Sequence, residues 1–248
     1  MADHGRRVLL LSNSTQAGRD YLAHAAAPIR AHFPAGGRIA FVPYALHDWD
    51  RYTAKAAAGL GALGYQVTGV HTGDPAAVVA EADGVFVGGG NTFRLTDAVY
   101  RTGLLDVLRR RVAAGLPYMG ASAGTVLAGP SIRTTNDMPI VQPPSFTALG
   151  LVGFQINPHY VGGGIAPGHM GETREQRLAE YLEENAVPVV GLPEGSWITA
   201  LGGTVTLGGT RDGVLFARGA DPAPLPLGSD LAALETAPRA GEPRGPEC

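Results

Sequence analysis

Short apolar runs alternate with helix-like stretches along most of this chain, and this alternation limits the fold more than any other feature. The runs with the length and composition of buried strands are 8–11, 39–42, 66–70, 85–87, 118–119, 154–156 and 187–190. The stretches with helical periodicity are 51–63, 75–82 and 92–114. A capping-box pattern that begins at Thr173 predicts one more helix. Because strands joined by helical crossovers form parallel sheets, we expect an α/β, three-layer fold whose mostly parallel sheet carries helices on both faces.

The pattern changes toward the C-terminus. The β-like pieces 197–201, 204–207 and 214–217 are separated by Gly-Gly or Asp-Gly pairs, which favour hairpin turns. They predict antiparallel hairpins at a sheet edge. Since 248 residues can build one large core, we expect a single domain over 1–220 and an irregular tail over 221–248.

The charge balance excludes some classes of partner. The chain has 19 basic and 22 acidic residues, and its only basic run, 109–111, suits a solvated helix face. Such a chain lacks the basic surface that nucleic-acid binding requires. The apolar run after Arg6 and Arg7 is far shorter than a signal peptide's core of about 7–15 residues or a membrane helix of about 20. We therefore expect a cytoplasmic protein that binds neither nucleic acid nor membrane.

The clearest chemical motif is Gly120-Ala121-Ser122-Ala123-Gly124, a G-x-S-x-G between an apolar strand and a candidate helix. This context is typical of a nucleophile elbow, in which glycines permit the sharp turn that holds a serine hydroxyl above the sheet. The alternative is a turn that serves only close packing of helix on strand. The single cysteine, Cys248, lies in a tail rich in Pro, Gly, Glu and Arg, so neither a buried cysteine nucleophile nor an intrachain disulfide is expected.

A serine needs a base to accept its proton at neutral pH. Among the seven histidines, His159 is distinguished by its position, because it follows the apolar run 154–156 through Asn157 and Pro158. That places it at the carboxyl end of a strand, where open α/β sheets build their sites. A histidine that merely stacks in a loop is the alternative interpretation.

Two carboxylates are candidates for orienting the imidazole. Glu194 follows an apolar run and, like His159, stands at the end of a predicted strand. Asp137 lies in a loop after Arg133 and is equally suited to a turn or an Asx cap. The pattern favours Glu194 slightly and leaves Asp137 as a rival or an auxiliary group.

The glycine run 88–90 follows a strand and precedes a helix candidate. Amides between Gly89 and Asn91 are candidates for one oxyanion donor, with Gly90 favoured, and the amide of Ala123 for the other. A phosphate-binding turn has similar features at this level. The glycines are not spaced G-x-G-x-x-G and no G-K-[ST] follows, so a nucleotide site is poorly supported.

Several uncommon strings occur in a set order along the chain: 88–95, 120–124, 133–139, 157–160, 171–177 and 191–195. Together they resemble the peptidase E family, the aspartyl dipeptidases among serine peptidases. The resemblance implies a fold related to class I glutamine amidotransferase domains and cytosolic hydrolysis of dipeptides that begin with aspartate, with no metal or cofactor. It places the family's nucleophile on Ser122, its base on His159 and its acid on Asp137 or Glu194.

A substrate with an acidic first residue needs a buried cation to face its carboxylate, because an unpaired charge is costly to desolvate. Arg174, at the start of the predicted helix, is the leading candidate, with Arg133 and His169 behind it. Glu172 is a candidate partner for the substrate's ammonium group. The alternative is that Arg174 only pairs with Glu172 or Glu175 on a solvated helix.

Three other functions compete with this hypothesis. An α/β-hydrolase esterase normally places its base late in the chain, whereas the last histidine here is His169. A cyanophycinase-like exopeptidase acting on β-linked aspartyl peptides would share Ser122 and His159. A glycine-rich anion-binding module would leave Ser122 inert. The expected partner is a small peptide substrate, and a homodimer is a further possibility.

Overall fold

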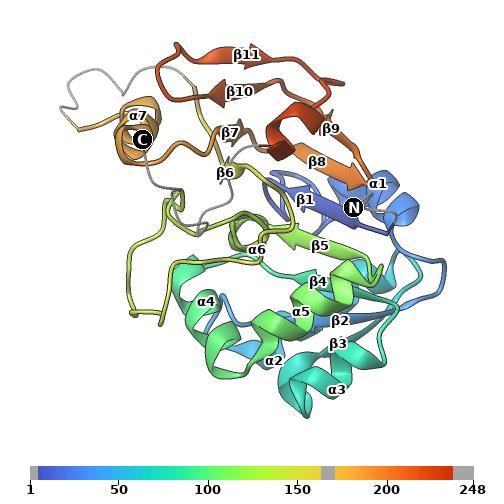
Figure 1. Ribbon diagram of the computed structural model, residues 1–248. Coiled ribbons are helices and arrows are strands. Elements are labelled where there is room, and N and C mark those ends of the chain that lie inside the picture. The colour runs from blue at the N-terminus through green and yellow to red at the C-terminus, as the bar shows by residue number, and fades with distance from the viewer. Residues whose placement is uncertain (1–4, 163–170, 237–248) are drawn as a thin grey trace.

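The computed structural model describes residues 5–162 and 171–236. Within these ranges, the larger sheet has seven strands in the order β3-β2-β4-β5-β1-β8-β9 (Figure 1). The strands are β1 Arg7–Leu11, β2 Arg38–Val42, β3 Gln66–Gly69, β4 Gly84–Val87, β5 Tyr118–Ala121, β8 Ser196–Leu201 and β9 Thr204–Gly209. The first five in chain order are parallel, and the β8–β9 hairpin adds antiparallel strands at one edge. The predicted α/β class with a mostly parallel sheet is confirmed.

Helices cover both faces of this sheet. They are α1 Ala26–His32, α2 Trp49–Gly61, α3 Pro75–Ala80, α4 Thr92–Arg101, α5 Leu104–Ala113 and α6 Ala123–Ala128. Alternate residues of β1 point to opposite cores: Val8 and Leu10 pack with residues of α3 to α6, and Leu9 and Leu11 with residues of α1 and α2. Strands buried on both faces read as unbroken apolar runs, which is why the sequence located them.

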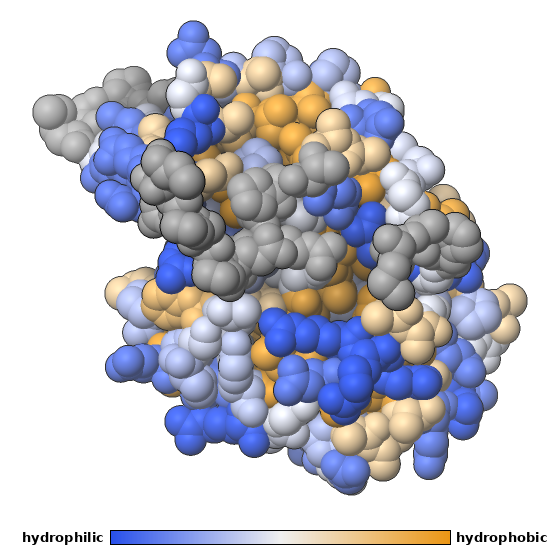
Figure 2. Space-filling view, viewed as in Figure 1, coloured by the Kyte–Doolittle hydropathy of each residue, from blue (hydrophilic) through white to orange (hydrophobic). Residues whose placement is uncertain are grey.

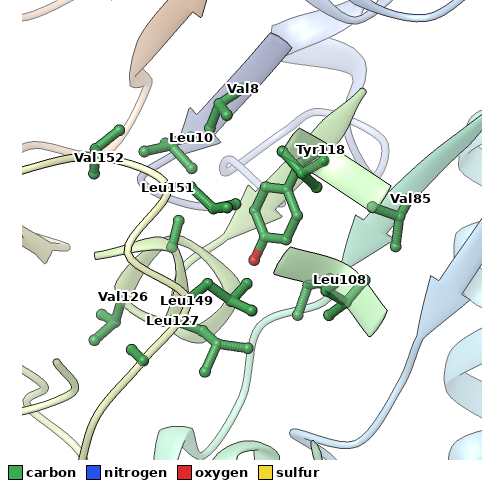
Figure 3. Packing of buried hydrophobic residues seen from close by; sticks show 14 of the residues in the cluster. Val8, Leu10, Val85, Leu108, Tyr118, Val126, Leu127, Leu149, Leu151 and Val152 are labelled. Atoms are coloured by element: carbon green, nitrogen blue, oxygen red, sulfur yellow. The ribbon is translucent and has the colours of Figure 1, made fainter. Parts of the chain in front are cut away.

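Tyr118 of β5 is buried in the core that the larger sheet forms with α4, α5 and α6. Figure 3 shows Tyr118 among Val85, Leu108 and Leu127, and its hydroxyl donates to the Gly124 carbonyl oxygen at 2.7 Å. Burial raises the pKa of the Tyr118 phenol, so the ring stays neutral. The bond ties the strand that precedes Ser122 to the helix that follows it.

A second sheet of the described chain, in the order β11-β10-β7-β6, lies above the first in Figure 1. Its strands are β6 Gln155–Pro158, β7 Val189–Leu192, β10 Gly213–Phe216 and β11 Ala223–Leu225. Strands β6 and β7 are parallel, while β10 is antiparallel to both of its neighbours. Helix α7, Arg174–Glu184, packs on this sheet through Leu178 and Leu182. Its N-terminus has the predicted capping box of Thr173 and Gln176.

The structure divides one predicted helical stretch and orders part of the predicted tail. The stretch 92–114 is helical as predicted, but it is not one continuous helix, because Gly103 has a φ of 67° and separates α4 from α5. A left-handed residue stops one helix and redirects the chain into the next. The segment 221–236 is not an irregular tail either: β11 pairs with β10, and Glu235 forms an ion pair with Arg6 at 2.9 Å. Prolines at 222, 224 and 226 disfavour a strand, which left this segment without a strand signal in the sequence.

No helix in the described ranges is long and apolar enough to cross a membrane. On the face seen in Figure 2, hydrophobic residues form separate patches among hydrophilic ones. The three short 3-10 helices of the described chain, Ala23–Ala25, Val70–Thr72 and Ala232–Thr236, occupy connections rather than the core layers.

Candidate active site

Ser122 occupies the turn between β5 and α6. Its φ of 51° is rare for a residue with a side chain, and such backbone strain costs on the order of 1–3 kcal/mol unless the surroundings enforce it. Here they do: the Ser122 amide donates to the Leu11 carbonyl at 3.1 Å, and the Ser122 carbonyl accepts from Thr125 and Val126 at 2.9 and 3.0 Å. The strain is therefore held by hydrogen bonds on both sides of the turn.

The glycines around Ser122 are required for close packing. A Cβ on Gly120 would lie 2.5 Å from the Gly124 carbonyl oxygen, and a Cβ on Gly124 would collide with the Val87 carbonyl. The neighbouring glycine turn is equally close, since a Cβ on Gly89 would lie 2.9 Å from the Ser122 Cβ. Packing and chemistry are thus served by the same motif, and the two interpretations of G-x-S-x-G do not exclude each other.

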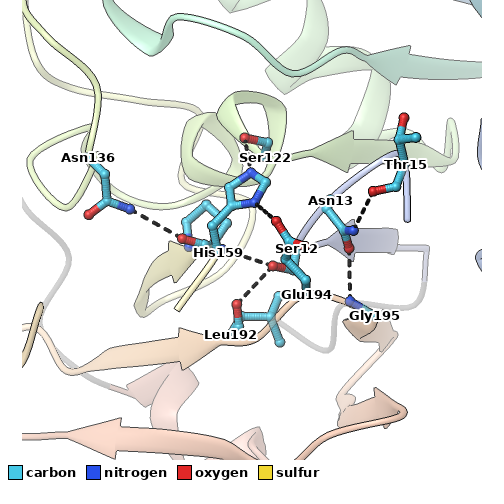
Figure 4. Close-up of polar contacts among 10 residues, drawn as sticks. Ser12, Asn13, Thr15, Ser122, Asn136, His159, Leu192, Glu194 and Gly195 are labelled. Atoms are coloured by element: carbon cyan, nitrogen blue, oxygen red, sulfur yellow. Dashed lines mark hydrogen bonds and ion pairs between the residues drawn. The ribbon is translucent and has the colours of Figure 1, made fainter. Parts of the chain in front are cut away.

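His159 and Glu194 lie in line with the serine. His159 Nε2 is 2.8 Å from Ser122 Oγ, and His159 Nδ1 is 2.7 Å from Glu194 Oε1. Figure 4 shows the imidazole between the hydroxyl and the carboxylate. His159 follows β6 and Glu194 follows β7, so the parallel pairing of these strands brings the two side chains together at one sheet edge. The arrangement can pass a proton from the serine to a histidine whose charge the carboxylate stabilises.

Asp137 makes different contacts. Its Oδ2 accepts hydrogen bonds from the Thr92 amide at 2.7 Å, the Thr92 hydroxyl at 2.6 Å and the Thr135 hydroxyl at 3.0 Å. A carboxylate at the first turn of α4 satisfies a free amide and the positive end of the helix dipole. The structure therefore joins Glu194 to the histidine and Asp137 to a helix terminus.

Two amides at the turn are available as oxyanion donors. Among the described residues, neither the Gly90 amide nor the Ala123 amide donates to another group of the chain. The amide of Ala123 opens α6, where a helix leaves its first N–H groups unpaired. The Asn91 amide, another candidate, is already bonded to the Ala45 carbonyl at 2.9 Å.

A pocket of about 170 Å³ lies beside the carboxyl end of β6. Arg174 lines it, and the Nη1 of Arg174 is buried with no hydrogen-bond partner. Burial lowers the pKa of Arg174, nearby Arg177 lowers it further, and Asp137 acts in the opposite direction. A buried guanidinium nitrogen without a hydrogen-bond partner at a pocket wall is suited to receive an anion.

The remaining residues predicted to contact the substrate have other partners. Glu172 pairs with Arg177 at 3.5 Å, and Arg133 lies over the Phe146 ring with 5.5 Å between the guanidinium carbon and the ring centroid. Glu175 accepts a hydrogen bond from the Tyr160 hydroxyl at 2.9 Å, so neither glutamate is bonded to Arg174. His169 lies outside the described residues.

Comparisons with known proteins agree with this geometry. Residues 8–208 match the model of peptidase family S51. The chain belongs to peptidase family S51. It is 60% identical to peptidase E of Streptomyces coelicolor over 228 aligned residues, and this aligned region covers 92% of this chain and 94% of that protein. It is 46% identical over 235 residues to peptidase E of Shewanella amazonensis, covering 92% and 98%.

A solved structure supports the fold of this family S51 member. The crystal structure of a peptidase from an acI-B1 Actinobacterium superimposes with a TM-score of 0.67 at 14% identity, covering 93% of this chain and 98% of that one. The family assignment makes the chain a peptidase, and the resemblance to peptidase E is confirmed. Among the described residues of this S51 peptidase, no group of three or more His, Cys, Asp or Glu side chains is placed to hold a metal ion.

The sequence analysis of this S51 peptidase did not identify two residues that lie next to His159 and Glu194. Ser12 and Asn13 follow β1, and their side chains are buried, with exposed fractions of 0% and 2%. They are polar residues at the carboxyl end of a central strand, which is the signal that would have found them. Their contacts are described below.

Proposed function

We propose that this chain is a serine dipeptidase that hydrolyses dipeptides with an N-terminal aspartate. The observation that carries the proposal is the unbroken hydrogen-bonded series Ser122–His159–Glu194, with heavy-atom distances of 2.8 and 2.7 Å. Its serine stands at a strained strand-to-helix turn, as nucleophiles of this kind do.

The reaction proceeds through an acyl-enzyme. His159 Nε2 takes the proton of the Ser122 hydroxyl while Oγ attacks the carbonyl carbon of the substrate's aspartate. The amides of Gly90 and Ala123 donate to the resulting oxyanion, and each such donor typically contributes about 10²–10³ in rate. The imidazolium then protonates the leaving amine, and the peptide bond breaks. A water molecule, deprotonated by His159, then attacks the ester carbonyl and forms a second tetrahedral intermediate. When this intermediate collapses, it releases the aspartate, and the imidazolium returns the proton to Ser122 Oγ.

Specificity for aspartate rests on Arg174. Its buried, unpartnered Nη1 lines the pocket beside β6, and a substrate carboxylate there would complete its hydrogen bonds. A neutral side chain in the same place would leave the guanidinium unpaired, which is costly in a desolvated site. Asp137 lines the same pocket but is not hydrogen-bonded to the Arg174 Nη1; its Oδ2 accepts from Thr92 and Thr135 instead.

The test compares three dipeptides on the purified full chain: α-Asp-Leu, β-Asp-Leu and Asn-Leu. We expect hydrolysis of α-Asp-Leu, at least tenfold lower kcat/KM for the other two, and stoichiometric labelling of Ser122 by a fluorophosphonate. Ser122→Ala should lose turnover by at least about 10⁴-fold. Ser229→Ala, which removes a hydroxyl from an exposed turn, should retain full activity.

Three outcomes would contradict the proposal. Turnover retained by Ser122→Ala rejects the nucleophile. Preference for the β-linked dipeptide indicates a cyanophycinase-like exopeptidase instead. An unlabelled Ser122 without hydrolysis of any dipeptide indicates the non-catalytic anion-binding module.

A further inference from the structure

The carboxyl end of β1 lies where the two sheets meet. In the larger sheet β1 pairs with β5, which precedes Ser122, and with β8, which follows Glu194. The residues that leave β1 therefore pass between the strand that precedes the nucleophile and the strand that follows the acid. Figure 4 shows Ser12 and Asn13 on this path, beside His159 and Gly195.

Three consecutive residues at this end each contact one member of the triad or its neighbour. The Leu11 carbonyl accepts from the Ser122 amide at 3.1 Å. The Ser12 hydroxyl accepts from the His159 amide at 2.9 Å. The Asn13 Oδ1 accepts from the amide of Gly195, next to Glu194, at 2.9 Å.

The contact of Ser12 with His159 is the most consequential of the three. His159 has a φ of 54°, so its backbone is in the left-handed region that disfavours a residue with a Cβ. Its side chain is 39% exposed, so packing alone does not fix the imidazole. A strained residue with a half-exposed side chain depends on the hydrogen bonds of its backbone.

The Ser12 hydroxyl acts both as a donor and as an acceptor. It donates its one proton to the Leu192 carbonyl at 2.8 Å and accepts from His159, so it links the end of β7 to the residue after β6. Because Ser12 is fully buried, bulk solvent does not contact these two hydrogen bonds. Loss of the hydroxyl would leave the His159 amide without its acceptor, whereas the Leu192 carbonyl would keep its second hydrogen bond, from the Tyr160 amide at 3.1 Å.

We infer that Ser12 is a positioning residue for the catalytic base: its buried hydroxyl holds the strained His159 backbone so that the imidazole lies between Ser122 and Glu194. The inference rests on the proposed function. Asn13 acts in the same way on the turn that carries Glu194, through the Gly195 amide. Neither residue touches the substrate or the reacting atoms.

The test uses Ser12→Ala in the full chain, with Ser196→Ala as a matched control. Ser196 is also buried, and its hydroxyl also joins a carbonyl and an amide, those of Arg211 at 2.7 and 3.2 Å. For each variant we would measure kcat and KM for α-Asp-Leu, the rate constant of fluorophosphonate labelling, and the fraction of protein finally labelled.

Ser12→Ala should lower kcat and the labelling rate constant together by about 10- to 100-fold, because a displacement of about 1 Å costs that much in a preorganised site. KM should change less than threefold and the labelled fraction should stay near that of the wild type. Ser196→Ala should keep both rate constants. If Ser12→Ala does not fold, Ser12→Cys, which keeps size and a weak donor, should show the same loss in milder form.

A folded Ser12→Ala with wild-type kcat and labelling rate would overturn the inference. So would an equal loss in Ser196→Ala, which would indicate general destabilisation, or a loss confined to the labelled fraction. Failure of the proposed function is distinct from all of these, because it is measured on the wild type itself, which would then either remain unlabelled at Ser122 or prefer the β-linked dipeptide.

Discussion

The two sheets hold their parts of the site by different means. In the larger sheet, Ser122 is followed by a helix whose every residue is buried, and its neighbouring glycines leave no space for a methyl group. In the smaller sheet, the side chains of His159 and Glu194 are 39% and 53% exposed and are directed by individual hydrogen bonds. The nucleophile is placed by close packing together with backbone hydrogen bonds, whereas the side chains of the base and the acid are placed by a few polar contacts alone.

This difference separates stability from rate. Close-packed positions resist change because a lost or added methyl group alters the whole core. Exposed polar side chains contribute little to folding, so a change there acts on chemistry alone. We therefore expect substitutions at the smaller sheet to reduce activity in a protein that remains folded, and substitutions in the larger sheet's cores to reduce stability.

Among substitutions on the side of the smaller sheet, the largest effect should come from Glu194→Gln. The amide keeps the shape of the side chain but removes the charge that orients and stabilises the protonated imidazole, so kcat should fall by about 10²–10⁴-fold. The melting temperature should hardly change, because the carboxylate is about half exposed. Steady-state kinetics and thermal denaturation of the same sample measure both quantities.

Asp137→Asn is the matched control for that experiment. It weakens three hydrogen bonds at the start of α4 and should cost about 1–3 kcal/mol of stability, with kcat within tenfold of the wild type. A larger loss of kcat in Asp137→Asn than in Glu194→Gln would reverse the roles assigned to the two acids.

A smaller loss of activity is expected from Arg174→Met. Arg174 begins α7, which packs on the smaller sheet, so this variant tests whether that part of the molecule also sets the specificity for aspartate. Removing the guanidinium should lower kcat/KM for α-Asp-Leu by about 10²–10³-fold while Asn-Leu changes little, because only the charged substrate loses its partner. Arg177→Met, at an exposed ion pair with Glu172, should stay within threefold. An equal loss for both dipeptides would show that Arg174 serves the fold instead.

The smallest expected effect is a pH dependence of stability that arises at His32, in α1 on one face of the larger sheet. Burial lowers the pKa of His32 from 6.5 to about 3, nearby Arg7 contributes in the same direction, and a backbone hydrogen bond at Tyr118 opposes both. The folded state thus keeps His32 neutral while the unfolded chain binds a proton below about pH 6.5. Stability from this group is complete above that pH and decreases as the pH falls toward 3.

When the pH falls from 7.5 to 5.5, the free energy of unfolding of His32→Leu should therefore decrease by about 1 kcal/mol less than that of the wild type. Urea denaturation of both proteins at the two pH values measures the difference. Equal losses in the two proteins would mean that His32 does not carry this pH dependence.

Much of the fold was predictable because its causes are local. Buried parallel strands are continuous apolar runs, and the capping box at Thr173 marks the start of α7 through adjacent residues. The division into two sheets was not predictable, since it depends on pairings between distant residues. Leu11 of β1 pairs with Trp197 of β8, and nothing local to either residue indicates the other.

The candidate site divides in the same way. Ser122 and His159 were identified because each has a local signal, a G-x-S-x-G or a position after a strand. The choice between Asp137 and Glu194 depends on which strand ends meet in space, so the sequence left it open. Ser12 was missed because its importance comes from Leu192 and His159, which approach it only in the folded chain.

The left-handed backbone at Ser122 has a consequence for protein engineering. Glycine adopts that conformation freely, so replacing the serine with glycine would relieve strain while removing the nucleophile. A directed-evolution campaign that rewards heat resistance alone would thus favour inert descendants at this codon. Libraries built on this scaffold need a turnover screen in every round to retain the hydroxyl.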